Sequence, residues 1–111
     1  MKKAGLFMET VATYRKHGWE LRSALLQPAT RAELGEQEAE LLNGINVREA
    51  PVDALWFSRP SHQQREAWEL RLLAQTPYAL FETFEAAEAE EDRDDVKLEM
   101  EARMREYATK G

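Results

Sequence analysis

A Trp-Glu-Leu-Arg tetrapeptide occurs twice in this chain, at residues 19–22 and again at residues 68–71. In both copies apolar side chains alternate with charged ones, which is the period of two expected of a strand with one buried face. Pro28 and Pro77 follow the two copies, where a strand should stop and the first turn of a helix can begin. Each copy therefore predicts a strand followed by a helix. Internal duplication and coincidence explain the repeat equally well.

If the two strands are antiparallel neighbours, Leu21 lies across from Leu70 and Glu20 falls opposite Arg71. Complementary charge pairs of this kind contribute about 0.2 to 1 kcal/mol each. The repeat thus predicts a central pair of strands, with the faces that carry Trp19 and Trp68 covered by helices.

The tract 78–84 suits either a helix or a strand, because its aromatic residues fit a helical face while its Thr and Phe content favours a strand. The equivalent segment of the first copy has the spacing of a capping box at residues 30–33, so the second is also predicted to be a helix, capped by Thr76. The expected elements are helices at 6–17, 30–42, 77–90 and from 93 onward, and strands at 18–26, 52–58 and 66–74, with a brief extended piece at 45–47.

This order, α-β-α-β-β-α-α, predicts an α+β fold with a small antiparallel sheet of three or four strands covered by helices. It is partly ferredoxin-like, with a helix in place of the final strand. An edge or face of the sheet would then be left for another chain. With 111 residues, the chain is expected to form one domain, with an acidic helical segment from about residue 82.

The chain contains no cysteine, which excludes thiolate catalysis and cysteine-ligated metal sites. The apolar run near the amino terminus ends at Glu9, too early for a signal peptide, and no segment reaches the roughly 20 apolar residues of a membrane helix. A cytoplasmic protein is expected. The Ala-, Arg-, Glu- and Leu-rich composition is typical of bacterial proteins.

The net charge of -6 is unevenly distributed. Residues 1–81 contain ten acidic and ten Lys or Arg residues, whereas residues 82–111 contain eleven acidic and five basic ones. Direct nucleic-acid binding is therefore disfavoured, because it depends on clustered basic residues.

Catalytic motifs are not evident. His17 and His62 have no nucleophile or metal-ligand pattern beside them, and Ser58–Ser61 lacks the glycines of a nucleophile elbow or a phosphate loop. Glu20 and Glu69 each have an arginine two residues further on, which makes them poor general acids. No stretch resembles the functional signature of a known family. The sequence predicts a protein without enzymatic activity, cofactor or metal.

Two surfaces are candidates for contact with another protein. The first is the strand around Trp56 and Phe57, which is apolar on both faces. The second is acidic: its glutamates recur at three- or four-residue intervals and would share one side of a helix. They are Glu82, Glu85, Glu88 and Glu91.

The leading hypothesis is a non-enzymatic interaction protein, an adaptor or an inhibitor of the immunity-protein kind, with a basic protein as its partner. The alternative is a small-ligand binder or enzyme whose pocket lies between sheet and helices, lined by Trp56, Tyr78 and Phe81 with Arg59 as the polar anchor. Homodimerisation through the second apolar face of the sheet is a third interpretation.

Overall fold

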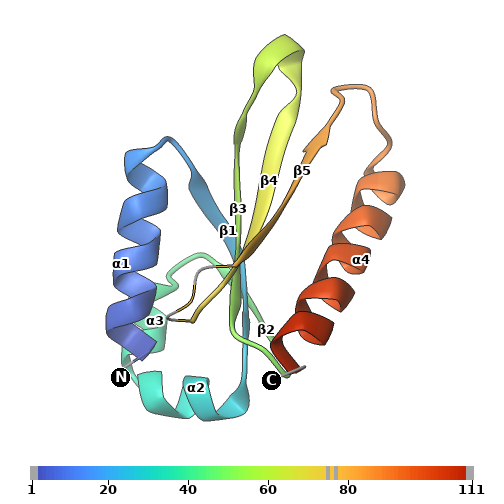
Figure 1. Cartoon of the computed structure of the whole chain (residues 1–111). Helices are drawn as coiled ribbons and strands as arrows, with labels where there is room; N and C mark the ends of the chain where they lie inside the picture. Colours follow the sequence, from blue (N-terminus) through green and yellow to red (C-terminus); the bar gives the residue numbers. More distant parts are fainter. Residues whose placement is uncertain (1–2, 75, 77, 110–111) are drawn as a thin grey trace.

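The computed structural model describes residues 3–74, 76 and 78–109 and contains a five-stranded mixed sheet between two layers of helices (Figure 1). The α+β class is confirmed, but the sheet has more strands than the three or four predicted. The elements in chain order are α1 (Lys3–Lys16), β1 (Glu20–Leu26), α2 (Pro28–Leu34), α3 (Gln37–Leu41), β2 (Asn46–Glu49), β3 (Ala54–Pro60), the 3-10 turn η1 (His62–Gln64), β4 (Glu66–Leu72), β5 (Ala79–Phe84) and α4 (Glu90–Thr109).

The two repeat copies form β1 and β4, as predicted, but they are not neighbours. The strand order is β2-β1-β3-β4-β5, so β3 lies between them and pairs antiparallel with both. Leu21 faces Phe57, and Leu70 faces Trp56, so the predicted pairing of the two leucines and of Glu20 with Arg71 is wrong. The ferredoxin-like arrangement is therefore wrong too. The strand β4 pairs with β3 on one edge and with β5 on the other, so no edge of β4 is left for β1.

A β-bulge interrupts β1 between Leu21 and Ser23. The extra residue changes which face the later side chains reach. Leu21 packs in the core beside α1, whereas Leu25, four residues on, packs in the core beside α4. As a result Trp19 belongs to the α1 core and Trp68 packs against the α4 core, although the repeat predicts one shared face.

The central strand β3 is covered on both faces, as its doubly apolar sequence predicts. Leu55 and Phe57 lie in the α1 core, and Ala54 and Trp56 lie in the α4 core. All four are at most 2% exposed. Burial on both sides explains why apolar residues run consecutively here instead of alternating with polar ones.

The segment predicted to be a helix at 77–90 contains β5, an edge strand antiparallel to β4. Inference from the repeat failed here because the first copy is followed by a helix and the second by a strand. In β5 the side chains alternate: Phe84 is 1% exposed on the α4 face, and Phe81 is 57% exposed on the other. Thr76 is in a bend and caps no helix, and Pro77 lies outside the described residues.

The predicted helix at 30–42 is two short helices, α2 and α3, separated at Gly35. Helix α2 begins at Pro28, not at Thr30, because proline suits the first helical position. Thr30 makes no capping box: its hydroxyl donates instead to the buried carboxylate of Asp53 at 2.6 Å.

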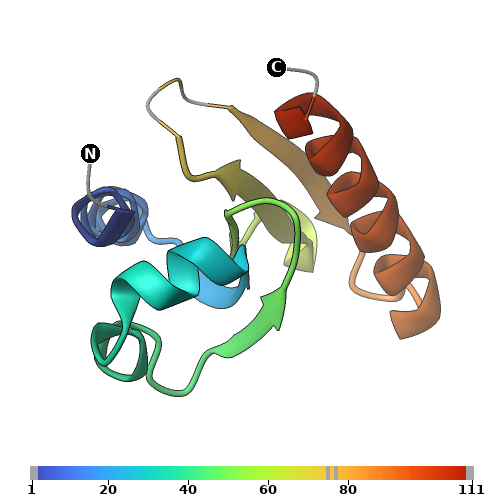
Figure 2. The same cartoon turned by 90° about the horizontal axis from the view of Figure 1, so that it is seen from below.

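Two diagonal corners of the sheet lack a helix. Helices α1, α2 and α3 lie on one side of the sheet and α4 lies on the other, over β4 and β5 (Figure 2). On the α1 face the strand pair β4–β5 keeps Phe81 and Thr83 exposed, and on the α4 face β1 and β2 keep Arg22 and Arg48 exposed. Each corner forms a hollow beside a helix.

Candidate binding sites

Trp56 and Phe57, the predicted interface residues on β3, are core residues. They are 2% and 0% exposed, and the indole Nε1 of Trp56 donates a hydrogen bond of 2.8 Å to Glu101. The Trp56 ring also makes an edge contact with Trp68 at 6.0 Å. Both side chains therefore belong to the core and not to the surface.

The four glutamates predicted to share a helical side lie on different elements. Glu82 is on β5, Glu85 and Glu88 are in the connection that follows it, and Glu91 is in the first turn of α4. Glu85 forms an ion pair with Arg65 at 2.9 Å. The acidic segment therefore presents a helical surface only from residue 90 onward.

The residues predicted to line a ligand pocket are split between the two faces of the sheet. Arg59 and Phe81 both lie near Trp19 on the α1 face: the Arg59 guanidinium carbon is 4.7 Å from a Trp19 ring centroid, and the Phe81 ring is 6.3 Å from it. Tyr78 lies on the α4 face, where it stacks on Tyr107 with ring centroids 3.6 Å apart. The predicted pocket is not assembled, but Arg59 lines a different hollow, and Phe81 contacts Trp19, which lines that hollow too.

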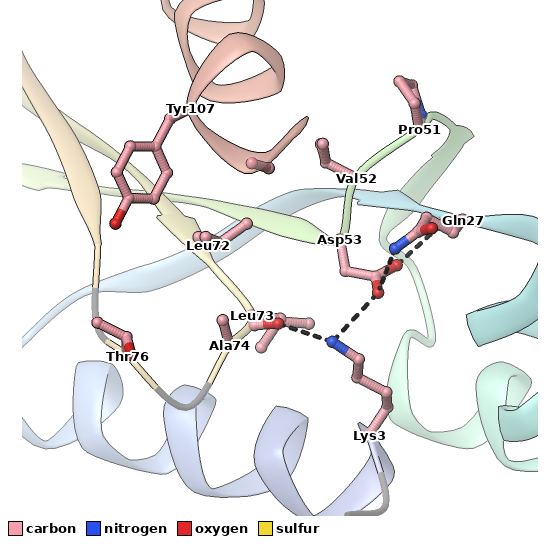
Figure 3. A pocket seen from close by; sticks show the side chains of 11 residues that line it. Lys3, Gln27, Pro51, Val52, Asp53, Leu72, Leu73, Ala74, Thr76 and Tyr107 are labelled. Carbon is pink, nitrogen blue, oxygen red and sulfur yellow. Dashed lines mark hydrogen bonds and ion pairs between the residues drawn. The ribbon is translucent and has the colours of Figure 1, made fainter. Parts of the chain in front are cut away.

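A hollow of about 640 Å³ lies where the first turn of α1, the last turn of α4, and the loops before β3 and after β4 come together (Figure 3). Its wall is mostly apolar, and its charged groups lie at one end. We call it the terminal hollow; it is lined by Lys3, Gln27, Pro51, Val52, Asp53, Leu72, Leu73, Ala74, Thr76, Tyr107 and Ala108.

Asp53 forms the polar end of the terminal hollow and is 2% exposed. Its carboxylate accepts hydrogen bonds from the backbone N–H of Gln27 at 2.8 Å, the Gln27 side-chain amide at 3.1 Å and the Thr30 hydroxyl at 2.6 Å. The Lys3 Nζ lies 3.4 Å away and also donates to the Leu73 carbonyl at 2.8 Å (Figure 3). Asp53 thus ties α1, α2 and β3 together, and this engagement leaves it poorly suited to act as a base.

The terminal hollow is electrically balanced at its polar end, because Lys3 and Asp53 carry opposite charges. A neutral molecule with a long apolar part matches this combination of wall and end better than an ion does. Sequence reasoning missed both residues. The available signal was one acid in the otherwise apolar run from Ala50 to Phe57, since a buried acid requires partners.

A second hollow of about 370 Å³ lies in the open corner between α1 and β4. It differs from the terminal hollow in being lined mostly by polar groups. We call it the arginine hollow; its lining residues are Thr13, Tyr14, His17, Trp19, Arg59, Glu69 and Arg71. His17 is exposed at its rim and offers its backbone carbonyl to Arg59 at 2.8 Å.

Tyr14 is neutral over the ordinary pH range because burial in the arginine hollow raises its pKa to about 12 from an ordinary value of 10.0. The hydrogen bond that its hydroxyl donates to Glu69 adds to this rise, while nearby Arg71 opposes it. The Tyr14 ring also stacks on Phe57, with centroids 4.0 Å apart. Tyr14 is therefore held in place as a hydrogen-bond donor to the Glu69 carboxylate.

Replacing Tyr14 with phenylalanine is expected to change stability at alkaline pH. The unfolded tyrosine ionises near 10.0 and the folded one near 12, so the wild type binds more protons when folded and loses stability as pH rises through this window. Urea unfolding at several pH values between about 9 and 12 should show a shallower loss in Tyr14→Phe. Equal slopes in the two proteins would contradict the assignment.

Along α4 the two basic residues of the first half turn toward the sheet. The Arg93 guanidinium donates to Glu66 at 3.1 Å and to the carbonyls of Glu85 and Glu88, and the Lys97 Nζ lies 3.5 Å from the Trp68 ring centroid. Burial lowers the pKa of Lys97, partly offset by nearby acids, chiefly Asp94.

The acidic residues of the same half of α4 point to solvent. Six of them are exposed, and no ion pair joins them to other described residues: Glu90, Glu91, Asp92, Asp94, Asp95 and Glu99. Glu101 is the exception on this helix, since it is buried between Arg48 and Trp56.

A groove of about 480 Å³ runs between α4 and the uncovered strands β1 and β2. Leu98, which is 58% exposed, and Asp94 border it from the helix, while Arg22 and Arg48 border it from the sheet. Leu98 follows Asp94 and Asp95 by four and three residues, so these acids are its neighbours on the helix surface.

Within residues 3–74, 76 and 78–109, no three His, Asp or Glu side chains lie close enough together to hold a metal ion. No helix in this part of the chain has the length and apolar character needed to cross a membrane.

No protein-family model matches the chain, and neither the curated proteins nor the solved structures contain a match to it.

Proposed function

We propose that this chain is a non-enzymatic interaction protein that binds a basic segment of another protein through the outer surface of α4 around Leu98. The single observation that carries the proposal is the separation of charge on this helix. Arg93 and Lys97 turn inward, and the six exposed acids of residues 90–99 form no ion pair with another described residue.

This separation leaves the outer surface of α4 strongly negative. The Arg93 side chain is 19% exposed and contacts Glu66 and backbone carbonyl groups. The Lys97 ammonium group lies over the Trp68 ring. Fields of this kind speed the encounter with a partner of opposite charge and select against partners of like charge. A lysine- or arginine-rich segment is the matching surface.

Leu98 supplies an apolar anchor inside this charged surface. It is one of the large apolar residues that remain exposed, and it borders a groove that a side chain of a partner can enter. Binding energy at interfaces is concentrated in a few such buried contacts, while surrounding charges contribute mainly to rate and specificity.

Neutralising the acids around Leu98 is expected to weaken binding to a basic partner. For Glu91→Gln, Asp94→Asn and Asp95→Asn together, affinity for a lysine- and leucine-containing amphipathic peptide should fall about tenfold, since each exposed charge contact contributes up to about 1 kcal/mol. Calorimetric titration at low and high salt measures this, and the wild-type affinity should fall steeply with salt.

The matched control removes the same charge elsewhere. Glu9, Glu36 and Glu40 are exposed acids far from α4 in sequence, and their replacement with glutamine should leave the affinity unchanged. Leu98→Ala should weaken binding at every salt concentration, whereas Met8→Ala, at another exposed apolar site, should not. An equal loss of affinity in both triple variants would show that only the net charge of the protein matters, and this result would overturn the proposal.

A further inference from the structure

We propose that the arginine hollow binds an oxyanion, a carboxylate or a phosphate, carried on an aromatic or similarly flat apolar group. The first observation is the state of Arg71. Its Nε is buried, and no hydrogen-bond acceptor among the described residues reaches it. A buried donor without a partner is destabilising, and more so in a charged group. An oxyanion bound to the Arg71 guanidinium from the hollow would supply the missing acceptor once a small movement of the side chain exposes this Nε.

The second observation is the charge balance of the arginine hollow. Arg59 and Arg71 are the two cations that line it, and Glu69 is the one carboxylate. Glu69 accepts the Tyr14 hydroxyl hydrogen bond and forms no ion pair of 4 Å or less with Arg71. The hollow is therefore positively charged, in a protein whose net charge is -6. Planar guanidinium groups bind carboxylate and phosphate oxygens through paired, charge-assisted hydrogen bonds.

Arg59 is held in place before any ligand arrives. It stacks over Trp19 at 4.7 Å, and one terminal nitrogen donates to the His17 carbonyl at 2.8 Å. Its remaining donors are at the exposed rim of the hollow. An arginine fixed in this way loses less conformational freedom on binding, and this favours affinity.

The third observation identifies what should carry the anion. Phe81 is 57% exposed and is the cross-strand partner of Glu69, which places it beside the hollow. It contacts Trp19 edge to face, with ring centroids 6.3 Å apart and an interplanar angle of 82°. A flat apolar group next to the oxyanion can cover the exposed Phe81 ring, and paired aromatic rings attract each other beyond the effect of burial alone.

This site is independent of the binding surface proposed on α4. The arginine hollow lies on the α1 face of the sheet, whereas α4 packs on the opposite face. Loss of either activity can therefore be observed while the other persists.

The test is a titration of the protein with four probes. NMR records the side-chain Nε–Hε signals of the arginines at each probe concentration. The probes are acetate, inorganic phosphate, benzoate and phenyl phosphate. Benzoate or phenyl phosphate should shift the Arg71 signal at millimolar concentration, and the corresponding probe without a ring should bind more weakly. The pair that binds more tightly identifies the anion as carboxylate or phosphate.

Variants separate the two parts of the proposal. Arg71→Gln should lower the affinity for the aromatic probe at least about tenfold. Arg59→Gln, on the exposed rim, should lower this affinity as well. Arg103→Gln, which removes an exposed arginine on α4, should leave binding unchanged. Phe81→Ala should reduce affinity for the aromatic probe to that of the simple anion.

The proposal is overturned if no probe moves the Arg71 signal, or if folded Arg71→Gln and Arg59→Gln proteins bind as the wild type does. Equal affinity for probes with and without a ring would overturn the role of Phe81. Arg71→Lys keeps the positive charge and removes the paired N–H donors of the guanidinium group. Wild-type affinity in this variant would show that these paired donors do not contribute to anion binding.

Discussion

Replacing Asp53 with alanine is expected to lower the free energy of unfolding by about 3 to 5 kcal/mol. The carboxylate is buried and accepts hydrogen bonds from Gln27 and Thr30 while it lies beside Lys3. Its removal leaves the Thr30 hydroxyl in the interior without this acceptor and separates the starts of α1, α2 and β3. For a protein of this size, total stability is about 5 to 15 kcal/mol, so the change is a large share of it.

Urea unfolding followed by circular dichroism measures this loss. Asp92→Ala is the matched control, because Asp92 is exposed and no ion pair joins it to another described residue; its effect should be within about 0.5 kcal/mol. If the two variants were equally stable, Asp53 would not organise the junction of the three elements.

Replacing Trp56 with alanine should cost a similar amount, about 3 to 5 kcal/mol. The side chain is 2% exposed, contacts Trp68 and donates a hydrogen bond to Glu101. Truncation leaves a cavity in the α4 core and removes one of the donors that satisfy the buried Glu101 carboxylate.

The conservative variant Trp56→Phe keeps an aromatic ring, though a smaller one, and loses the indole N–H, so it should retain most of the stability that alanine removes. Both variants, when folded, should bind the basic peptide as the wild type does, because Trp56 is in the core. A stable Trp56→Ala protein with weakened binding would instead support a contact role for β3.

Local patterns predicted several elements correctly. The alternation in β4 and the doubly apolar run in β3 predict strands that the structure contains. The stripe of Val96, Met100, Met104 and Tyr107 predicts the buried side of α4: Met100 and Met104 are buried there and Val96 packs against them, but Tyr107 is 42% exposed. In each case the spacing of apolar residues within the segment itself indicates which side of it is buried.

Relations between distant segments were not predictable in the same way. The strand β5 occupies the edge of β4 that was predicted for β1, and the bulge after Leu21 shifts the face of half a strand. The tract 78–84 is compatible with helix and strand, and its pairing with β4 decides between them.

The candidate sites also depend on contacts between distant segments, which the sequence does not predict. An acidic carboxyl-terminal helix is visible in the sequence, but the inward turn of Arg93 and Lys97 depends on Glu66 and Trp68, which lie on another element. The arginine hollow joins Tyr14 to residues 55 and 57 positions away, Glu69 and Arg71. Removing all residues after Phe81 would also remove Met100 and Met104 from the core, so charge variants test α4 better than truncation does.

The most direct test of the proposed function is affinity capture from a lysate of the cells in which the protein occurs, read by mass spectrometry. The wild type, the α4 triple variant and the control triple variant are compared at low and high salt. The proposal predicts a partner with a basic segment that is retained by the wild type and the control and is lost from the α4 variant and at high salt. A partner retained equally by all three proteins, or one insensitive to salt, would contradict a binding surface on α4.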